Sequence, residues 1–393
     1  MSLIRNSSAT ELVPGAHRAA FLLDPTWDFL NHGSFGACPR PVLEAQRRVQ
    51  EELEAQPVAF LVRTLPERLE ALRRRFGAFL GADPAGLAFI QNATTGIASV
   101  LGSVPLQPGD RVLTTSHRYY AVRRALDRGA AAGGWAVDEA PLPAVVLDDD
   151  CVIEAIFDKV TPKTRLLVVD ALTSPSALRL PVERICAEAR QRGILTLVDG
   201  AHAPGHVPVD LRALGADWWV GNLHKWLCAP KGAALLWAAE AHRGATHQAI
   251  PSHGFQLGLH AEFDWPGTFD PSAWLASGAA LDLHEAWGGP ALMAANHALA
   301  GYGQRQIAAA LGIEPPHADS PDRYGAMAAL RLPLPAAQAK PLYEALIKRR
   351  FELPIQPFAG AVWLRISAFS PYNVPDQYDR LAALLPTLVR GLA

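Results

Sequence analysis

Apolar and polar positions along the chain alternate between a helical and an extended period, which predicts helices interleaved with strands. Apolar residues recur at helical spacing in residues 41–56 and 66–80. Short apolar runs typical of buried strands occupy residues 87–90, 111–114, 164–169, 194–198 and 215–220. Further helical stretches lie at residues 96–103, 120–131, 149–157 and 181–192. We therefore expect an α/β fold with a mostly parallel sheet that is covered on both faces.

Glycine and proline residues interrupt this pattern between residues 244 and 270. A helical stretch follows from Trp274 to about Trp287, and the rest of the chain predicts a smaller α+β part. Its expected elements are strands at 326–332 and 361–367 and a helix at 336–351. Pro341 lies either near the first turn of that helix or at a later start. We expect three parts: residues 1–40, 41–270 and 271–393.

Composition favours a soluble, cytoplasmic enzyme. The 393 residues suffice for two domains and a sizeable core, and 19% of them are charged. The net charge of −2 gives no basic field for nucleic acid, and no apolar run is long enough to span a bilayer. Met1–Asn6 lacks the pattern of a signal peptide. The four cysteines are widely spread without a CxxC motif, which is typical of reduced thiols.

Two polar residues that follow predicted strands carry the candidate chemistry. Asp199 ends the apolar run 194–198, and Lys225 follows the next strand 26 residues later. In parallel sheets, ligands bind at this carboxyl edge. A lysine that attacks a carbonyl group and an aspartate that pairs with a protonated ring nitrogen are what a pyridoxal phosphate site requires. A single lysine is more often a solvated surface residue, and such an aspartate is often a helix cap, but their pairing weakens both alternatives.

Four segments of the chain resemble the class V aminotransferase family, and within it the isopenicillin N epimerase-like branch. They are Leu30–Pro39, Gln91–Gly96, Val198–Gly205 and Gly221–Gly232, and the resemblance extends from about residue 25 to the C-terminus. It implies the fold-type I architecture, with a large domain built on a seven-stranded sheet and a smaller α+β C-terminal domain. It also implies pyridoxal 5′-phosphate as the cofactor, held by Lys225, and an N-terminal segment (1–40) that packs on the active site and the small domain.

The phosphate of such a cofactor needs a cradle, and Asn92–Ile97 provides a candidate. This segment follows a strand and opens a helix, where backbone N–H groups and the helix dipole favour an anion. Thr94 and Thr95 add hydroxyl donors, although a plain helix cap is the alternative. The resemblance favours the phosphate. It implies further cofactor contacts from Gly96, His202, Asn222 and His224.

The resemblance also implies an aromatic residue over the cofactor ring. Tyr119 is the first choice and His117 the second, while an aromatic side chain packed under a loop is the alternative for either. Tyr119 could also act as an acid or base on the face opposite Lys225. Ser174 is expected near the ring hydroxyl.

Substrate contacts are expected from two regions. Arg365 lies on the predicted strand 361–367, and its fork suits an α-carboxylate, with a surface salt bridge as the alternative. By resemblance it is the carboxylate clamp of the small domain. Asn31, His32 and Gly33 resemble a segment that folds over the active site, although His32 alone would more often be a capping or packing residue.

The segment around Gly267 and Thr268 resembles one that crosses a dimer interface and reaches the cofactor phosphate of the partner. We therefore expect a homodimer with shared active sites. Relatives often carry an arginine after the threonine, and Phe269 replaces it here. The histidines at 242, 247, 253 and 260 lack the spacing of a helical metal pair, so no metal site is expected.

The expected reaction begins with proton removal from the α-carbon of an amino acid by Lys225. Reprotonation on the other face gives epimerisation, which is the leading expectation. The alternatives are a C–S (β-) lyase of the hercynylcysteine sulfoxide lyase type and an aminotransferase. A cysteine desulfurase is disfavoured because the last cysteine, Cys228, lies only three residues past the lysine. A nucleotide-binding protein would need GxGxxG, which is missing, and a pseudo-enzyme would not need Asp199, His224 and Lys225 together.

Overall fold

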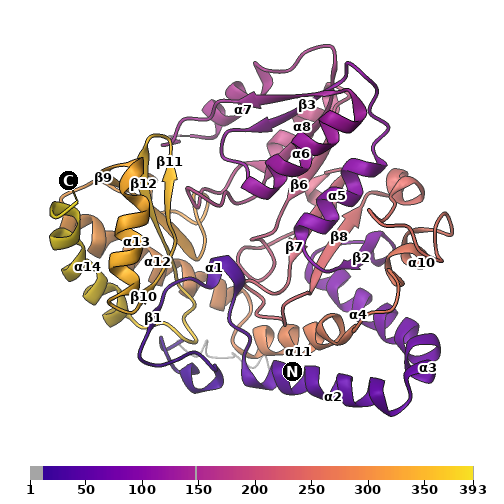
Figure 1. The fold of residues 1–393 in the computed structure, drawn as a ribbon, viewed down its shortest axis with the longest axis horizontal. Helices are drawn as coiled ribbons and strands as arrows, with labels where there is room; N and C mark the ends of the chain where they lie inside the picture. Colours follow the sequence, from indigo (N-terminus) through magenta and orange to yellow (C-terminus); the bar gives the residue numbers. More distant parts are fainter. Residues whose placement is uncertain (1–11, 147, 393) are drawn as a thin grey trace, which may run out of the picture.

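The computed structural model describes residues 12–146 and 148–392, so Met1–Asn6 and the rest of residues 1–11 lie outside the described residues. Seven strands form the large sheet in the order β2-β8-β7-β6-β5-β3-β4 (Figure 1). Their bounds are Leu87–Ile90 (β2), Arg111–Thr115 (β3), Ala136–Ala140 (β4), Thr164–Asp170 (β5), Leu195–Asp199 (β6), Trp218–Asn222 (β7) and Ala234–Ala238 (β8). β8 runs antiparallel to both its neighbours, and the other pairs are parallel. The predicted α/β fold with a mostly parallel sheet is confirmed.

Helices cover both faces of this sheet, which explains why its strands are apolar without alternation. In β5, Leu167 and Val169 join one buried cluster, whereas Leu166 and Val168 join another. The covering helices are α2 (Arg40–Ala55), α4 (Leu65–Phe79), α5 (Ala93–Ser103), α6 (Tyr120–Gly133), α7 (Asp149–Phe157), α8 (Val182–Gln191) and α11 (Ser272–Ala286). Shorter helical segments are α3 (Pro57–Ala59), a π-helical turn at Phe60–Thr64 and α9 (Leu211–Leu214).

A second, antiparallel sheet forms the small C-terminal part, in the order β11-β12-β9. Its strands are β9 (Met327–Pro335), β11 (Ile355–Phe358) and β12 (Ala361–Ser367), and its helices are α12 (Pro290–Leu311), α13 (Ala339–Ile347) and α14 (Pro375–Arg390). Pro341 lies in the first turn of α13, where its missing N–H is harmless. The helix ends at Ile347, short of the predicted residue 351, because residues 351–352 form strand β10. The domain limits themselves stay a prediction.

The N-terminal segment lies between the two sheets. Strand β1 (Asp28–Phe29) pairs in parallel with β10 (Phe351–Glu352), which attaches the segment to the small part. The short helix α1 (His32–Phe35) follows and lies between the two sheets in Figure 1. The carbonyl oxygen of Gly36 accepts a hydrogen bond from Lys231 Nζ at 3.0 Å. The segment therefore contacts both parts of the molecule.

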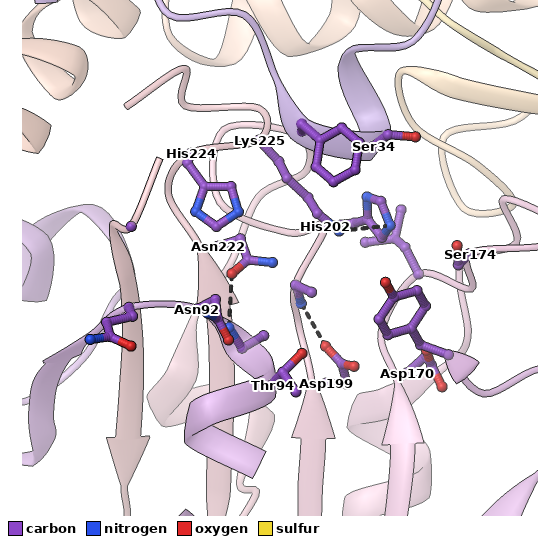
Figure 2. Close-up of a pocket in the computed structure, with 17 residues that line it drawn as sticks. Ser34, Asn92, Thr94, Asp170, Ser174, Asp199, His202, Asn222, His224 and Lys225 are labelled. Atoms are coloured by element: carbon purple, nitrogen blue, oxygen red, sulfur yellow. Dashed lines mark hydrogen bonds between the residues drawn. The ribbon is translucent and has the colours of Figure 1, made fainter. Parts of the chain in front are cut away.

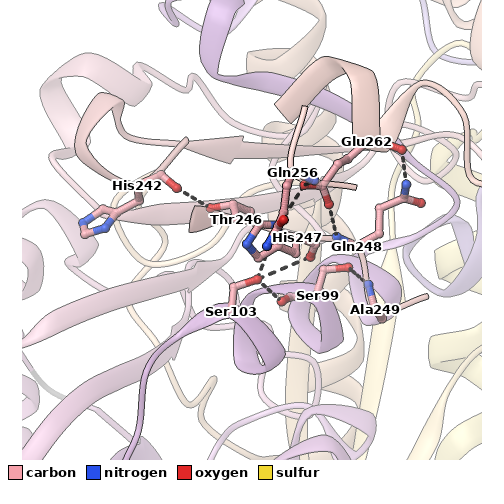
Figure 3. A network of polar contacts seen from close by, with 9 residues as sticks. All are labelled: Ser99, Ser103, His242, Thr246, His247, Gln248, Ala249, Gln256 and Glu262. Carbon is pink, nitrogen blue, oxygen red and sulfur yellow. Dashed lines mark hydrogen bonds and ion pairs between the residues drawn. The ribbon is translucent and has the colours of Figure 1, made fainter. Parts of the chain in front are cut away.

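A buried carboxylate, that of Glu262, organises residues 244–270, where the alternation of helices and strands is interrupted. Glu262 in helix α10 (Leu259–Phe263) is 2% exposed. Its carboxylate accepts hydrogen bonds from the backbone N–H groups of Gln256 at 2.9 Å and Gln248 at 3.3 Å. His247 Nδ1 lies 2.7 Å from the same carboxylate (Figure 3). Side-chain hydrogen bonds thus replace a strand ladder and fix this loop.

Within residues 12–146 and 148–392, no helix is long and apolar enough to cross a membrane. In the same ranges, no group of three or more His, Cys, Asp or Glu side chains could hold a metal ion.

Candidate active site

A cavity of about 270 Å³ opens at the carboxyl ends of the central strands, where the sequence places the candidate chemistry. It is bordered by the ends of β5, β6 and β7, the start of α5 and the N-terminal segment (Figure 2). Its lining includes Ser34, Phe35, Gln91, Asn92, Thr94, Tyr119, Asp170, Ser174, Asp199, His202, Asn222, His224 and Lys225.

Lys225 follows strand β7 and extends into this cavity, as Figure 2 shows. Its Nζ lies 3.3 Å from Nε2 of His202. Burial lowers the pKa of the Lys225 amine to about 8, with the Asp199 carboxylate opposing this shift and the Arg365 guanidinium adding to it. A lysine with this pKa is partly uncharged near neutral pH, and the uncharged amine is the form that attacks a carbonyl group.

Asp199 and Asp170 end the neighbouring strands β6 and β5 and pair in their register. Both line the cavity, and each is 4% exposed. Burial raises the pKa of both carboxyls, and Asp199 raises that of Asp170 further, because two adjacent buried carboxylates resist charging together. Asp199 accepts the backbone N–H of Ala201 at 2.9 Å and has Lys225 beside it. We expect Asp199 to carry the negative charge and Asp170 the proton.

The start of helix α5 faces the same cavity. Asn92 is the helix cap, and its Oδ1 accepts the backbone N–H of Thr95 at 2.9 Å and the Thr95 hydroxyl at 3.2 Å. Asn222 reaches across from β7, and its Oδ1 accepts the N–H of Ala93 at 2.9 Å. Thr94 lines the cavity, and its side chain makes no hydrogen bond to the described residues. Thr94 is therefore the hydroxyl available to an anion, whereas that of Thr95 is engaged.

Gly96 lets this helix lie close to the sheet. A Cβ at this position would sit 2.6 Å from Ile90 Cδ1 and 2.7 Å from Val220 Cγ1. Gly96 does not line the cavity. Gly96 therefore sets the position of the start of α5, the candidate phosphate cradle, and its direct contact with a cofactor stays a prediction.

His224 lines the cavity beside Lys225. Its Nδ1 lies 3.0 Å from the carbonyl oxygen of Ala233, which can only accept, so Nδ1 carries the proton. Burial lowers the pKa of the His224 imidazole to about 4. At neutral pH its Nε2 therefore presents a lone pair, and a phosphate oxygen at this position requires a second proton on the ring.

The two aromatic candidates for ring stacking occupy different places. Tyr119 caps helix α6, is 45% exposed and lines the cavity. His117 is fully buried outside the cavity lining, with Nδ1 2.9 Å from the Ser176 hydroxyl and Nε2 3.1 Å from the carbonyl oxygen of Pro143. Of the two, Tyr119 is the one able to reach a molecule in the cavity.

Arg365 is a buried cation that does not itself line the cavity but contacts Ser34 and Ser174, which do. It is 2% exposed and forms no ion pair with a carboxylate of the described residues. One guanidinium nitrogen donates to the carbonyl oxygen of Ser174 at 2.8 Å, and the other donates to the Ser34 hydroxyl at 3.3 Å. Burial lowers the pKa of Arg365 to about 10. The surface salt bridge considered for Arg365 does not form, and a buried unpaired guanidinium is a strong anion site.

The N-terminal segment lines the cavity next to the predicted Asn31, His32 and Gly33, whose contact with a substrate stays a prediction. Asn31 donates to Glu352 at 3.2 Å, and the Gly33 N–H donates to the Ser367 hydroxyl at 3.1 Å. His32 is fully buried among aromatic rings, and burial lowers its pKa to about 3. None of these three residues lines the cavity, whereas the next two, Ser34 and Phe35, do. The motif Leu30–Pro39 indicated that this segment lies at the site, but it did not indicate which of its side chains point into the cavity.

Gly267 and Thr268 lie outside the cavity lining in the loop after α10. Gly267 has a φ of +112° with no atom within 4 Å of its hypothetical Cβ, and Thr268 is exposed. Their expected contact is with a second chain and stays a prediction.

The residues present fit pyridoxal phosphate. A partly buried lysine of lowered pKa, a carboxylate that can pair with a ring nitrogen and a helix start with a free hydroxyl surround one cavity (Figure 2). When bound through Lys225, the cofactor supplies an electron sink for reactions at the substrate α-carbon.

Comparisons with known proteins identify the family of this chain. Residues 36–334 match the family Aminotransferase class-V. The chain is 34% identical over 385 residues to an isopenicillin N epimerase of Amycolatopsis lactamdurans, covering 93% of this chain and 96% of that protein. It is 31% identical over 272 residues to an L-cysteine desulfhydrase of Arabidopsis thaliana, covering 65% of this chain and 60% of that protein.

A solved structure of similar fold is that of C-DES, in a mutant with glycine covalently linked to its PLP cofactor. The TM-score is 0.80 at 20% sequence identity, and the match covers 95% of this chain and 98% of that chain. At this identity the likeness concerns the fold.

Proposed function

Because the chain belongs to the aminotransferase class-V family of pyridoxal phosphate-dependent enzymes, we propose that it acts at the α-carbon of an amino acid as an epimerase. The family resemblance, the enzyme class and the cofactor expected from the sequence are thereby confirmed. The reaction outcome is the proposal. Its main support is the meeting of Lys225, Asp199 and Tyr119 on one cavity, beside the unpaired cation of Arg365.

Each residue has a role that follows from its surroundings. Arg365 would bind the α-carboxylate of the substrate, since its buried charge lacks an acidic partner among the described residues. Asp199 would hold a positive charge on the ring nitrogen of the cofactor. Lys225, with its lowered pKa, would take the α-proton. Tyr119 would deliver a proton to the other face of the α-carbon. The phosphate would lie at the start of α5, near Thr94 and His224.

A C–S lyase is the second candidate, because one relative is named L-cysteine desulfhydrase. Such a reaction needs proton removal by Lys225 but no second proton carrier across the cavity. An aminotransferase likewise lacks this requirement. Persulfide chemistry at Cys228 is disfavoured, since burial raises the pKa of its thiol far above the ordinary value.

Tyr119→Phe separates these outcomes, with the neighbouring exposed Tyr120→Phe as a matched control, since Tyr120 does not line the cavity. The enzyme is incubated in D₂O with isopenicillin N, L-cysteine and L-alanine. Epimerisation gives loss of chirality with one deuterium at the α-carbon, whereas a lyase releases sulfide and pyruvate. We expect Tyr119→Phe to lower epimerisation by about 100-fold or more. Sulfide release that is unaffected by Tyr119→Phe would refute the epimerase and support the lyase.

We also propose a homodimer, which the open space at Gly267 and the exposure of Thr268 support. If Thr268 reaches the site of the partner, Lys225→Ala and Thr268→Asp variants should each lose activity. Mixing them under conditions that exchange subunits should restore part of it, because one site per hybrid dimer is intact. A monomer in solution or a lack of restoration would contradict the shared site.

A further inference from the structure

Trp226, the residue after the lysine, is fully buried beside two histidines. Its indole Nε1–H donates to Nδ1 of His202 at 3.4 Å. The His206 ring stacks on the indole, with centroids 4.2 Å apart and planes inclined by 26°. His206 is itself held at both nitrogens, since Nδ1 lies 2.9 Å from the carbonyl oxygen of His202 and Nε2 accepts the Ala326 N–H at 2.5 Å. The indole is therefore fixed in direction.

This contact determines where the proton of His202 sits. An indole N–H can only donate, so Nδ1 of His202 must present a lone pair. A neutral imidazole with a bare Nδ1 carries its proton on Nε2. The His202 ring is 5% exposed. Burial, together with the nearby cations Lys225 and Arg365, holds the pKa of His202 well below its ordinary value. The proton on Nε2 then points at Lys225 Nζ, 3.3 Å away.

We propose that Trp226 is a positioning residue that fixes His202 as the Nε2–H tautomer and thereby favours the uncharged amine of Lys225. An amine has a lone pair that accepts the imidazole N–H. An ammonium has three N–H groups and no lone pair, so it would face the imidazole N–H without an acceptor. The opposite tautomer would accept from the ammonium and favour the charged lysine. The inference rests on the proposed role of Lys225 as the reactive amine.

None of the other charged groups near Lys225 supplies a directed hydrogen bond that favours the amine. Asp199, at the end of β6, favours the ammonium, and Asp170, at the end of β5, would do so when ionised. Arg365, from β12, favours the amine by repulsion alone. His202 contributes a directed hydrogen bond, and its direction depends on Trp226.

The tautomer can be read directly in the wild-type protein. Histidine ring ¹⁵N resonances distinguish protonated from unprotonated nitrogens, and His202 is assigned by the signal that disappears in His202→Gln. We expect Nε2 protonated and Nδ1 unprotonated in cofactor-free protein between pH 7 and 8. A proton on Nδ1, or an imidazolium, would overturn the inference without any variant of Trp226.

The consequence for the lysine is measured with Trp226→Phe, which removes the donor and keeps an aromatic ring. Trp237→Phe is the matched control, because Trp237 is also buried and its indole N–H has no partner among the described residues. Cofactor-free protein reacts with formaldehyde and cyanoborohydride across a pH series, and modification is quantified on the Lys225 peptide. We expect the pH of half-maximal rate to rise by about 0.5–1 unit in Trp226→Phe, the size of one ordinary hydrogen bond, and to stay unchanged in Trp237→Phe.

An equal profile for Trp226→Phe and wild type, or a shift to lower pH, would overturn the role of Trp226. The proposed function is judged separately by whether pyridoxal phosphate becomes attached to Lys225 in the wild type. If it does, a negative result in the pH series counts against the tautomer alone. If it does not, the proposed function fails while the ¹⁵N resonances still decide the tautomer.

Discussion

Gly36 lies where the N-terminal segment packs against the backbone of the lysine loop, which is the connection between β7 and β8 (residues 223–233) that carries Lys225. Its φ is +66°, and a Cβ at this position would be 2.2 Å from the carbonyl oxygen of His224 and 2.4 Å from that of Lys225. With a ψ of 165°, the Gly36 backbone adopts a conformation that is essentially restricted to glycine, so we predict that Gly36→Ala costs about 1–3 kcal/mol in backbone strain. Overpacking should add about 1–3 kcal/mol, because the atoms it meets are backbone and cannot rotate away. The variant should therefore be destabilised by about 2–6 kcal/mol.

Gly258→Ala separates the two contributions. Gly258 has the same kind of backbone, with a φ of +105° and a ψ of 163°, but no atom lies within 4 Å of its hypothetical Cβ, so its substitution should incur only the backbone cost. Urea-induced unfolding of both variants gives the difference in stability, and the rate of pyridoxal phosphate attachment to Lys225 reports displacement of the loop. We expect Gly36→Ala to be the less stable variant and to react more slowly. If the two variants match in both measurements, the segment does not rest on the lysine loop as described.

Four further predictions concern the site and its support. Asp199→Ala should keep the cofactor attached but lower turnover by roughly 100-fold or more, since the charge on the ring nitrogen loses its partner; spectra and steady-state rates check this. Arg365→Met should raise KM about 10- to 100-fold, matching the loss of a charge-assisted hydrogen bond pair, with little loss of attached cofactor. Phosphate binding should add a proton to His224, whose pKa is about 4 in the free protein, so the affinity for phosphate should fall as pH rises. Calorimetry in buffers of different ionisation enthalpy should show this proton uptake at about pH 7, and His224→Gln should abolish it. Glu262→Ala should lower the free energy of unfolding by about 2–4 kcal/mol and expose its loop to proteolysis, unlike the exposed Glu240→Ala.

The strands of the large sheet could be predicted because burial on both faces leaves a plain signal. Residues 164–169 form a continuous apolar run, and β5 spans Thr164–Asp170. Helix α7 coincides with the predicted 149–157, since Asp148 caps it by accepting the Cys151 N–H. Two strands of this sheet were not predicted. Strand β8 is short and follows a turn without alternation, and the edge strand β4 contains the acidic pair Asp138–Glu139 in place of an apolar run.

Helix α12 was missed for a related reason. Leu292, Asn296, Leu299 and Gly303 share one buried face at helical spacing, but two of these four residues are not large and apolar. Gly301 and Ala308 are buried on another side, so the helix shows no single apolar stripe. The 22 residues are also rich in alanine and glycine, which weakens any periodic signal.

The candidate site was predictable where one local motif contains the chemistry. Asp199 and Lys225 each end or follow a strand, and the parallel sheet brings such positions to one edge. Contacts between distant segments had no local signal. Arg365 meets Ser174, 191 positions away, and the sequence alone could not decide between a buried clamp and a surface ion pair. The hydrogen bond that Trp226 donates to His202 depends on the packing of His206 and was not predicted.

The most direct test of the account is the absorption spectrum of purified protein with pyridoxal phosphate, before and after borohydride, followed by peptide mapping. We predict a yellow band that borohydride bleaches, with the reduced cofactor attached to Lys225 and lost in Lys225→Ala, which should remain folded. No band, or attachment at another lysine, would contradict it.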